Sequence, residues 1–426
     1  MSIDTIFALS SGRPPAAVSV IRVSGPAAHA AGSSLAGSLP APRLAALRTL
    51  RDEAGQVLDD ALVLRFDGPA SSTGEDVVEL HCHGGRAVVD AVLGALGRRN
   101  ALRVAKPGEF TRRAFENGRI DLTEAEGLAD LLEAETESQR KAALAMAEGG
   151  LRHQVATWQA ELLQLSARAE AAIDYADEDE TAVDRSLIQG IAALHANLSE
   201  WLERPRVEPL KDGVRVVVAG PPNAGKSSLI NAISGQDKAI VTDVPGTTRD
   251  QIEVPLTLGG IPVLLTDTAG LRETAELVER IGIERARSSV ATADILLWLG
   301  EPSAAPSHPR LLKIYPRADL PDRQSTPDDT IRVSAKTGEG ISALLDRIGR
   351  LALTLLPAED AIALNRRQAR HLAEARYSLT DVSLMDDIVL IAEALRSARA
   401  AFDRLTGRAG MEDVLDALFG RFCLGK

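Results

Sequence analysis

A glycine-rich segment at residues 220–227 restricts the fold of this chain more than any other feature. It reads GPPNAGKS and fits the phosphate-loop pattern GxxxxGK[ST]. β-Branched residues precede it from Val214, and apolar residues with helical spacing follow it from Leu229. A simple glycine turn between a strand and a helix is the alternative, but the motif and its flanking pattern agree. The segment therefore predicts a strand, an anion-binding loop and a helix.

The residue types of this loop suit a phosphate chain and its metal ion. Glycines at positions 220 and 225 let backbone N–H groups turn toward an anion at a helix N-terminus. Lys226 can reach the outer phosphates, and the Ser227 hydroxyl can ligate Mg²⁺. We therefore expect a bound nucleoside triphosphate with magnesium.

Length and charge limit what else the chain can be. Its 426 residues predict two to four domains, and the low aromatic content of 3% beside abundant Ala and Leu favours helical packing over an all-β fold. The net charge of −12 argues against nonspecific coating of nucleic acid, so RNA contact must be local or involve a basic partner. Two cysteines far apart, no charge-free segment of membrane-spanning length and no secretion signal predict a cytoplasmic protein without membrane contact.

The hydrophobic pattern changes three times along the chain and predicts α/β plus all-α architecture. Residues 1–117 contain expected strands at 17–23, 61–66 and 77–82 and a helix at 87–96. Residues 118–211 and 356–426 have helical spacing, and DLTE from Asp121 suits a helix start. Because helical segments bracket the strand-rich residues 212–355, we expect a nucleotide-binding domain inserted into a split helical domain.

Two clusters of potential metal ligands do not favour metal binding. His81, Cys82 and His83 are adjacent on an expected strand, so their side chains alternate between faces and cannot converge well on one ion. The acidic run at 177–180 is typical of a solvated loop or helix start.

Further motifs in the nucleotide module indicate hydrolysis of a triphosphate. The segment 267–270 (DTAG) follows an apolar strand, as the magnesium-holding aspartate of phosphate-loop proteins does. The segment 246–250 (GTTRD) lies between the two phosphate motifs and offers Thr248 to the γ-phosphate and its metal. Leu271 has no polar atom to orient a water, so Glu276 or Glu279 could serve instead; both could equally be solvated glutamates.

Guanine recognition is predicted at a turn in which an asparagine is missing. The residues 316–319 read PRAD where Asn-Lys-x-Asp is usual, so the asparagine's ring contact and loop tether are expected to be lost. Asp319 can still accept both N–H groups of guanine, which adenine does not offer. Ser334, Ala335 and Lys336 follow the next strand, as a base-supporting loop would.

The motifs together resemble a known family nearly end to end, namely the bacterial tRNA-modification GTPases called MnmE or TrmE. The matching stretches are residues 220–228, 239–250 (AIVTDVPGTTRD), 267–272 (DTAGLR), 278–286 (VERIGIERA), 74–79 (GEDVVE), 106–110 (KPGEF) and 422–426 (FCLGK). A generic GTPase would share residues 220–228 and 267–272, but not 74–79, 106–110 and 422–426.

This resemblance implies three parts and a defined chemistry. They are an N-terminal folate-binding domain (1–117) that forms a homodimer, a helical domain split into 118–211 and 356–426, and an inserted Ras-like G domain (212–355). The family acts with an FAD-dependent MnmG (GidA)-type flavoprotein in a heterotetramer. Together they add a carboxymethylaminomethyl or aminomethyl group to C5 of the wobble uridine of tRNA. The one-carbon unit comes from a 5-formyl or 5,10-methylene tetrahydrofolate derivative.

The resemblance also assigns roles to individual residues. Glu279 is expected to orient water, which favours it over Glu276, and Cys423 is expected to be the tail cysteine needed for modification. Magnesium is expected at Ser227 and Thr248, and potassium at Asn223, Thr242, Val244 and Thr247. The expected GTP-binding residues are Asn223, Ala224, Gly225, Lys226, Ser227, Ser228, Thr242, Asp243, Val244, Pro245, Gly246, Thr247, Thr248, Asp267, Thr268, Ala269, Gly270, Asp319, Ser334, Ala335 and Lys336. The expected folate-binding residues are Arg22, Glu79, Arg119, where the family usually has lysine, and Lys426.

A second hypothesis depends on the G motifs alone. It is a GTP-switched ribosome or RNA assembly factor without modification chemistry. Failure of the N-terminal domain to bind folate, together with GTP-dependent ribosome binding, would favour it.

Overall fold

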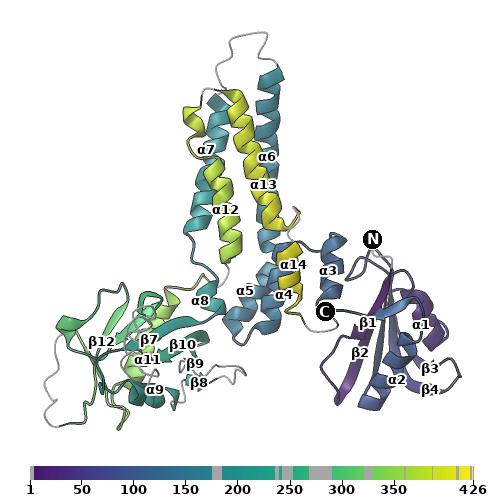
Figure 1. Cartoon of the computed structure of the whole chain (residues 1–426), viewed down its shortest axis with the longest axis horizontal. Coiled ribbons are helices and arrows are strands. Elements are labelled where there is room, and N and C mark those ends of the chain that lie inside the picture. The colour runs from purple at the N-terminus through teal and green to yellow at the C-terminus, as the bar shows by residue number, and fades with distance from the viewer. Residues whose placement is uncertain are drawn as a thin grey trace, which may run out of the picture. The chain divides into compact units, whose positions relative to one another are not determined.

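The computed structural model forms two compact units. One contains residues 1–129, 146–194 and 374–426, and the other contains 130–145 and 195–373 (Figure 1). The structure describes residues 4–174, 185–235, 239–241, 253–267, 290–320, 329–358, 361–385, 387–408, 412–422 and 425. Within these residues no helix is long and apolar enough to cross a membrane.

The first unit begins with a six-stranded sheet in the order β3-β4-β5-β2-β1-β6. Neighbouring strands are antiparallel except β6, which pairs parallel with β1. The strand bounds are β1 Thr5–Leu9, β2 Ala16–Ser24, β3 Ala45–Arg51, β4 Val57–Phe66, β5 Val77–Gly84 and β6 Leu102–Val104. The three strands expected from the sequence are thus confirmed within β2, β4 and β5.

The two faces of this sheet are covered unequally. Helices α1 (Ala28–Ala36) and α2 (Arg86–Gly97) join one face in a core that includes Phe7, Ile21 and Leu80. Because side chains alternate along a strand, Ile6 and Ala8 lie on the opposite face, where they pack with Phe110 of α3 (Glu109–Glu116). The same face leaves Val18, Leu47 and Leu62 exposed by 52%, 67% and 45%. The described residues therefore cover this face only partly.

Long helices complete the first unit, as the 3.6-residue periodicity predicts. Trp158 of α6 (Gly150–Asp174) stacks on Phe402 of α13 (Ile388–Thr406), with ring centroids 5.9 Å apart. Helix α14 (Glu412–Phe419) packs on α3, and Phe115 lies 6.3 Å from Phe419 between ring centroids. The remaining helices of the helical segments are α4 (Leu122–Glu133), α5 (Glu137–Ala147), α7 (Arg185–Glu203), α8 (Glu208–Lys211) and α12 (Arg366–Ser378). Helix α8 and most of α5 belong to the second unit, whereas α4, α7 and α12 each have residues in both units.

Helix α4 begins with the cap expected from the DLTE sequence. The Asp121 carboxylate accepts from the backbone N–H groups of Thr123 and Glu124 at 2.9 and 3.0 Å. In return, the Glu124 carboxylate accepts from the backbone N–H of Asp121 at 2.7 Å. This reciprocal capping satisfies donors that the helix itself leaves unpaired.

The second unit contains a seven-stranded sheet in the order β13-β12-β11-β7-β10-β9-β8. Strands β7, β10, β11, β12 and β13 are parallel, whereas β8 and β9 pair antiparallel at one edge. The bounds are β7 Val214–Ala219, β8 Ala239–Val241, β9 Glu253–Leu258, β10 Ile261–Asp267, β11 Ile295–Trp298, β12 Leu311–Tyr315 and β13 Ile331–Arg332. Helices α9 (Lys226–Ser234) and α11 (Ile341–Leu353) pack into its core.

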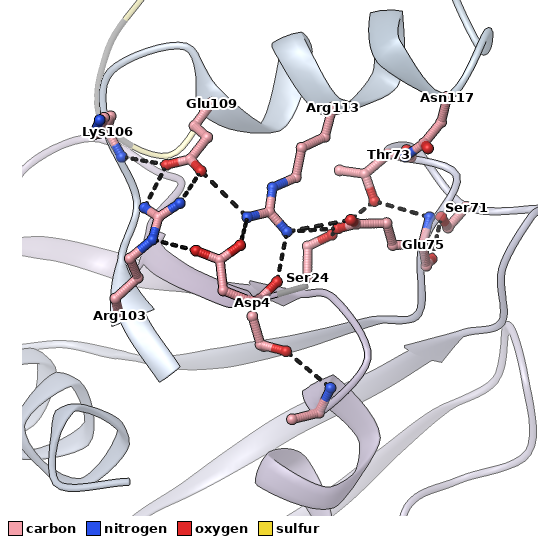
Figure 2. A network of polar contacts seen from close by, with 12 residues as sticks. Asp4, Ser24, Ser71, Thr73, Glu75, Arg103, Lys106, Glu109, Arg113 and Asn117 are labelled. Atoms are coloured by element: carbon pink, nitrogen blue, oxygen red, sulfur yellow. Dashed lines mark hydrogen bonds and ion pairs between the residues drawn. The ribbon is translucent and has the colours of Figure 1, made fainter. Parts of the chain in front are cut away.

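A network of charged groups joins α3 to Asp4, the residue before β1, and to the loop before β5 (Figure 2). At its centre Arg113, only 3% exposed, contacts Asp4, Glu75 and Glu109 at 2.9, 3.0 and 3.2 Å. Burial alone would raise the pKa of the Glu109 carboxyl. Hydrogen bonds from Arg103, the Lys106 backbone and Arg113 outweigh this and hold the pKa below its ordinary value. The stabilisation by Glu109 is therefore present at neutral pH and is lost as the pH falls through that lowered pKa.

Replacing Arg113 by methionine should destabilise this network strongly. The change leaves the half-buried Glu75 carboxylate without its cation and removes one of the two arginines that pair with Asp4 and Glu109. Removing one partner of a buried ion pair typically costs about 3–5 kcal/mol. Arg112→Met is the matched control, since Arg112 is a neighbouring, more exposed arginine paired with Glu116 and Asp416, and it should cost at most about 1 kcal/mol. Amide hydrogen exchange in β1 and α3 measures both free energies of opening. Equal effects of the two changes would contradict the central role of Arg113.

Candidate functional site

The phosphate loop connects β7 to α9 as the sequence predicts. Gly220 and Gly225 have φ values of +152° and +97°, backbone conformations that side chains with a Cβ rarely adopt. A Cβ on Gly220 would also lie 3.2 Å from the backbone carbon of Leu299. Lys226 is buried, and its Nζ donates to the carbonyl oxygens of Gly220 and Pro221 at 2.9 Å each. The Lys226 ammonium group is thus held by backbone carbonyls of the phosphate loop itself.

Two magnesium-type oxygen ligands meet beside this loop. Strands β7 and β10 are parallel and in register, with Asp267 opposite Val218, so both strands end at the same edge of the sheet. The Ser227 Oγ donates to the Asp267 carboxylate at 2.8 Å, and Asp267 is buried. A hydroxyl and a carboxylate at this separation suit Mg²⁺, which prefers hard oxygen ligands and binds with few protein groups.

The base-recognition turn is held by the loop that follows β13. The Asp319 carboxylate accepts from the Ser334 Oγ at 2.7 Å. This hydrogen bond and a backbone hydrogen bond, helped by the charges of Lys336 and Arg317, lower the pKa of the Asp319 carboxyl. Asp319 is therefore ionised at neutral pH, the state that can accept two hydrogen bonds from guanine.

Arg317 connects the recognition turn to the phosphate loop, a contact that was not predicted from the sequence. Its guanidinium donates to the carbonyl oxygen of Asn223 in the phosphate loop at 2.8 Å. Both residues have positive φ, near +60°. The missing asparagine of the recognition turn thus does not leave the two loops unconnected. Asn223 and Arg317 are 94 positions apart, so the sequence shows the positive charge of Arg317 but not its partner.

Several predicted residues lie outside the described part of the chain. Their roles stay predictions from the sequence. They are Thr242, Asp243, Val244, Pro245, Gly246, Thr247, Thr248, Thr268, Ala269, Gly270, Leu271, Glu276, Glu279, Cys423 and Lys426, together with the acidic run 177–180.

Two of the predicted folate residues meet on the partly covered face of the N-terminal sheet. Arg22 and Glu79 are cross-strand partners on β2 and β5, and their side chains form an ion pair at 2.8 Å. The Arg22 guanidinium also lies over the Phe110 ring, 5.7 Å from its centroid. His81 extends the group, because its Nε2 lies 3.2 Å from the other oxygen of Glu79. Arg119 is exposed, and its Cγ would lie 3.3 Å from a Cβ placed on Gly74.

The adjacent His81, Cys82 and His83 do not form a joint metal site. Cys82 is buried in the core on the opposite face, where burial raises the pKa of its thiol to about 12. His83 instead contacts Asp59 at 2.7 Å. Among the described residues, potential ligand atoms do gather at His29, Asp67 and Asp76. The two nitrogens of His29 face different carboxylates there, each at 3.4 Å, as in a bridged ion pair.

The parallel sheet, the phosphate loop and the Ser227–Asp267 pair define a P-loop nucleotide-binding protein. Two family models match this chain: "GTP-binding protein TrmE N-terminus" covers residues 5–119, and "MnmE helical domain" covers 122–423, a range that includes the phosphate loop. Proteins named tRNA modification GTPase MnmE are similar over 99% of this chain. Those of Erythrobacter litoralis and Novosphingobium aromaticivorans are 54% and 53% identical, and each is covered over its full length. That of Zymomonas mobilis is 52% identical over the same share. The chain therefore belongs to the MnmE family of tRNA modification GTPases.

Replacing Asp319 by asparagine should change base preference from GTP to xanthosine triphosphate. An amide pairs better with the carbonyl that xanthine presents at that edge, and hydrogen bonds to charged groups are worth about 1.5–3 kcal/mol. We expect GTP affinity to fall about 10- to 100-fold, measured by titration with labelled nucleotides. Asp329→Asn is the control, because Asp329 is an exposed carboxylate of the same unit that pairs with Lys313. An unchanged preference would mean that Asp319 does not read the base.

Proposed function

We propose that this protein is a potassium-dependent GTPase that modifies tRNA together with a flavoprotein partner. The pair would add a carboxymethylaminomethyl or aminomethyl group to C5 of the wobble uridine. The observation that carries the proposal is the similarity, over nearly the whole chain, to proteins named tRNA modification GTPase MnmE. The geometry of the phosphate loop and of the N-terminal sheet agrees with the two halves of this chemistry.

In the hydrolytic half, the phosphate loop binds and orients GTP. Lys226 would move from the two loop carbonyls, where it now donates, onto the outer phosphate oxygens. Ser227 would hold Mg²⁺, with Asp267 beside it and Thr248 on the γ-phosphate side. Asn223, with oxygens of Thr242, Val244 and Thr247, would hold K⁺, and Glu279 would orient the attacking water. When bound, the two cations would stabilise the negative charge on the phosphate oxygens during hydrolysis.

The Leu271 side chain gives a reason for this arrangement. It stands where small GTPases carry a water-orienting glutamine and has no polar atom. Charge stabilisation by K⁺ and water positioning by Glu279 would together replace the missing groups. Asp319, held ionised by Ser334, would select guanine.

In the carbon-transfer half, the open face of the N-terminal sheet would bind the tetrahydrofolate derivative. Arg22 and Glu79 present a cation and a carboxylate there, beside exposed apolar side chains such as Val18 and Leu62. A flat heterocycle with hydrogen-bonding edges fits such a mixed surface. Arg119 and Lys426 would contact the rest of the cofactor, and Cys423 would take part in the modification.

The proposed partners follow from the same surfaces. The exposed Val18, Leu47 and Leu62 support a homodimer through a second copy of this sheet. The net charge of −12 favours a basic surface on an MnmG-type partner as the place where tRNA binds. We propose a cytoplasmic heterotetramer. We also keep the four segments 1–117, 118–211, 212–355 and 356–426 as the proposed domains.

Exchanging potassium for sodium should slow GTP hydrolysis and tRNA modification together. Sodium is smaller and fits the proposed Asn223 site poorly, so we expect at least about a tenfold loss, equivalent to about 1.4 kcal/mol of activation free energy. The assay contains the protein, its flavoprotein partner, GTP, a tetrahydrofolate donor and unmodified tRNA, with phosphate release and modified nucleosides measured in parallel. Asn223→Ala should abolish the difference between the salts, whereas Asn231→Ala, an exposed asparagine of α9, should preserve it. Equal rates of GTP hydrolysis by the wild-type protein in both salts would contradict the potassium mechanism.

A further inference from the structure

The last described residue of the chain is attached to the end of its first strand. The Ser10 Oγ donates to the carbonyl oxygen of Gly425 at 2.5 Å, across 415 positions of sequence. Ser10 itself continues the sheet, because its backbone N–H donates to the carbonyl oxygen of Val20 at 2.7 Å. A hydroxyl fixed by the sheet thus holds the backbone of the C-terminal segment.

Gly425 is suited to this contact by its lack of a side chain. It is buried, and its φ is +97°. A Cβ there would lie 2.0 Å from the carbonyl oxygen of Leu9 and 2.8 Å from the Cα of Ser10. Distances this short to backbone atoms cannot be relieved by a rotamer change. The approach of Gly425 to β1 therefore depends on glycine at this position.

The chain just before this contact is also anchored within the first unit. Phe422 is buried in a cluster with Leu122 and Phe419, and its ring centroid lies 6.1 Å from that of Phe419. At Gly108, before α3, a Cβ would lie 2.2 Å from the carbonyl oxygen of Phe419. Two close backbone approaches thus hold the end of the chain against the N-terminal domain, one at Phe419 and one at Gly425.

The register of the sheet places this attachment beside the proposed folate residues. Along β1, Leu9 pairs with Ile21 and Ala8 pairs with Arg22. Arg22 in turn pairs with Glu79 on β5. Ser10 follows β1 directly and lies two residues after Ala8, the residue opposite Arg22. The Gly425 contact is therefore made close to Arg22 along the sheet.

We propose that Ser10 is a positioning residue that holds the C-terminal tail beside the Arg22–Glu79 pair. The role in modification rests on the proposed function, because Cys423 is two residues from Gly425 in the sequence. The attachment itself does not depend on that function. Loss of the Ser10 hydroxyl should free the tail without altering the phosphate loop, which lies in the other unit.

The first test measures tail attachment alone, by the alkylation rate of Cys423 in the intact protein. Cys82 stays silent in this assay because it is buried and its thiol pKa is raised to about 12. Ser10→Ala should speed alkylation about fivefold, which corresponds to the roughly 1 kcal/mol of a typical hydrogen bond. Ser10→Thr, which keeps the hydroxyl, should restore the slow rate.

Ser11→Ala is the matched control. Its hydroxyl accepts from the Val20 backbone N–H at 3.0 Å within the β1–β2 connection and should not affect the tail. Gly425→Ala should also speed alkylation of Cys423, because its Cβ would clash with Leu9. This variant leaves the residues of the sheet unchanged, so it remains informative if Ser10→Ala destabilises the sheet. Unchanged alkylation in both Ser10→Ala and Gly425→Ala would overturn the attachment.

The second test measures tRNA modification by the same variants with the flavoprotein partner. Ser10→Ala should lower the modification rate about fivefold while GTP hydrolysis stays at the wild-type rate, and Ser10→Thr should rescue it. Faster alkylation with unchanged modification would overturn the positioning role. If wild type yields no modified uridine, the proposed function fails, whereas the alkylation result still decides whether Ser10 holds the tail.

Discussion

The parallel register of β7 and β10 is the constraint on which the nucleotide site depends. It brings the ends of the two strands to one edge, so that Ser227 at the start of α9 meets Asp267 at 2.8 Å. A shift of β10 by one residue would turn Asp267 toward the other face of the sheet. The parallel neighbours β11 and β12 then place the Asp319 turn at the same edge, where Arg317 reaches back to the phosphate loop. One sheet register thus assembles phosphate, metal and base recognition.

The sequence predicted those features that depend on local pattern. The phosphate loop, the capping of α4 and some strands of each sheet were visible because their signals lie within a few neighbouring residues. Contacts between distant positions were not visible. The Arg317 tether joins a turn and a loop 94 residues apart, and the residues of the turn by themselves do not indicate it. The Ser10–Gly425 contact spans nearly the whole chain, and no local pattern marks a serine as the partner of a tail glycine.

The same distinction explains what could be predicted of the folate residues. Arg22 and Glu79 came from family resemblance, whereas the reason for their pairing is the β2–β5 register. Their ion pair is made on a sheet face that also carries exposed apolar residues, a combination that no single strand sequence reveals. The buried Arg113 network fixes α3 beside this face, so that Phe110 can pack under the Arg22 guanidinium. A GTPase in tRNA modification therefore keeps its hydrolytic loop and its proposed carbon-transfer surface on two separately assembled sheets.

The most direct test of this account is nucleoside analysis of tRNA from cells with and without this protein. Mass spectrometry of digested tRNA should show the C5-aminomethyl-type wobble uridines in the wild type and their loss in the deletion strain. A gene carrying Ser227→Ala should not restore them, whereas the wild-type gene should. Unchanged wobble uridines in the deletion strain would contradict the account.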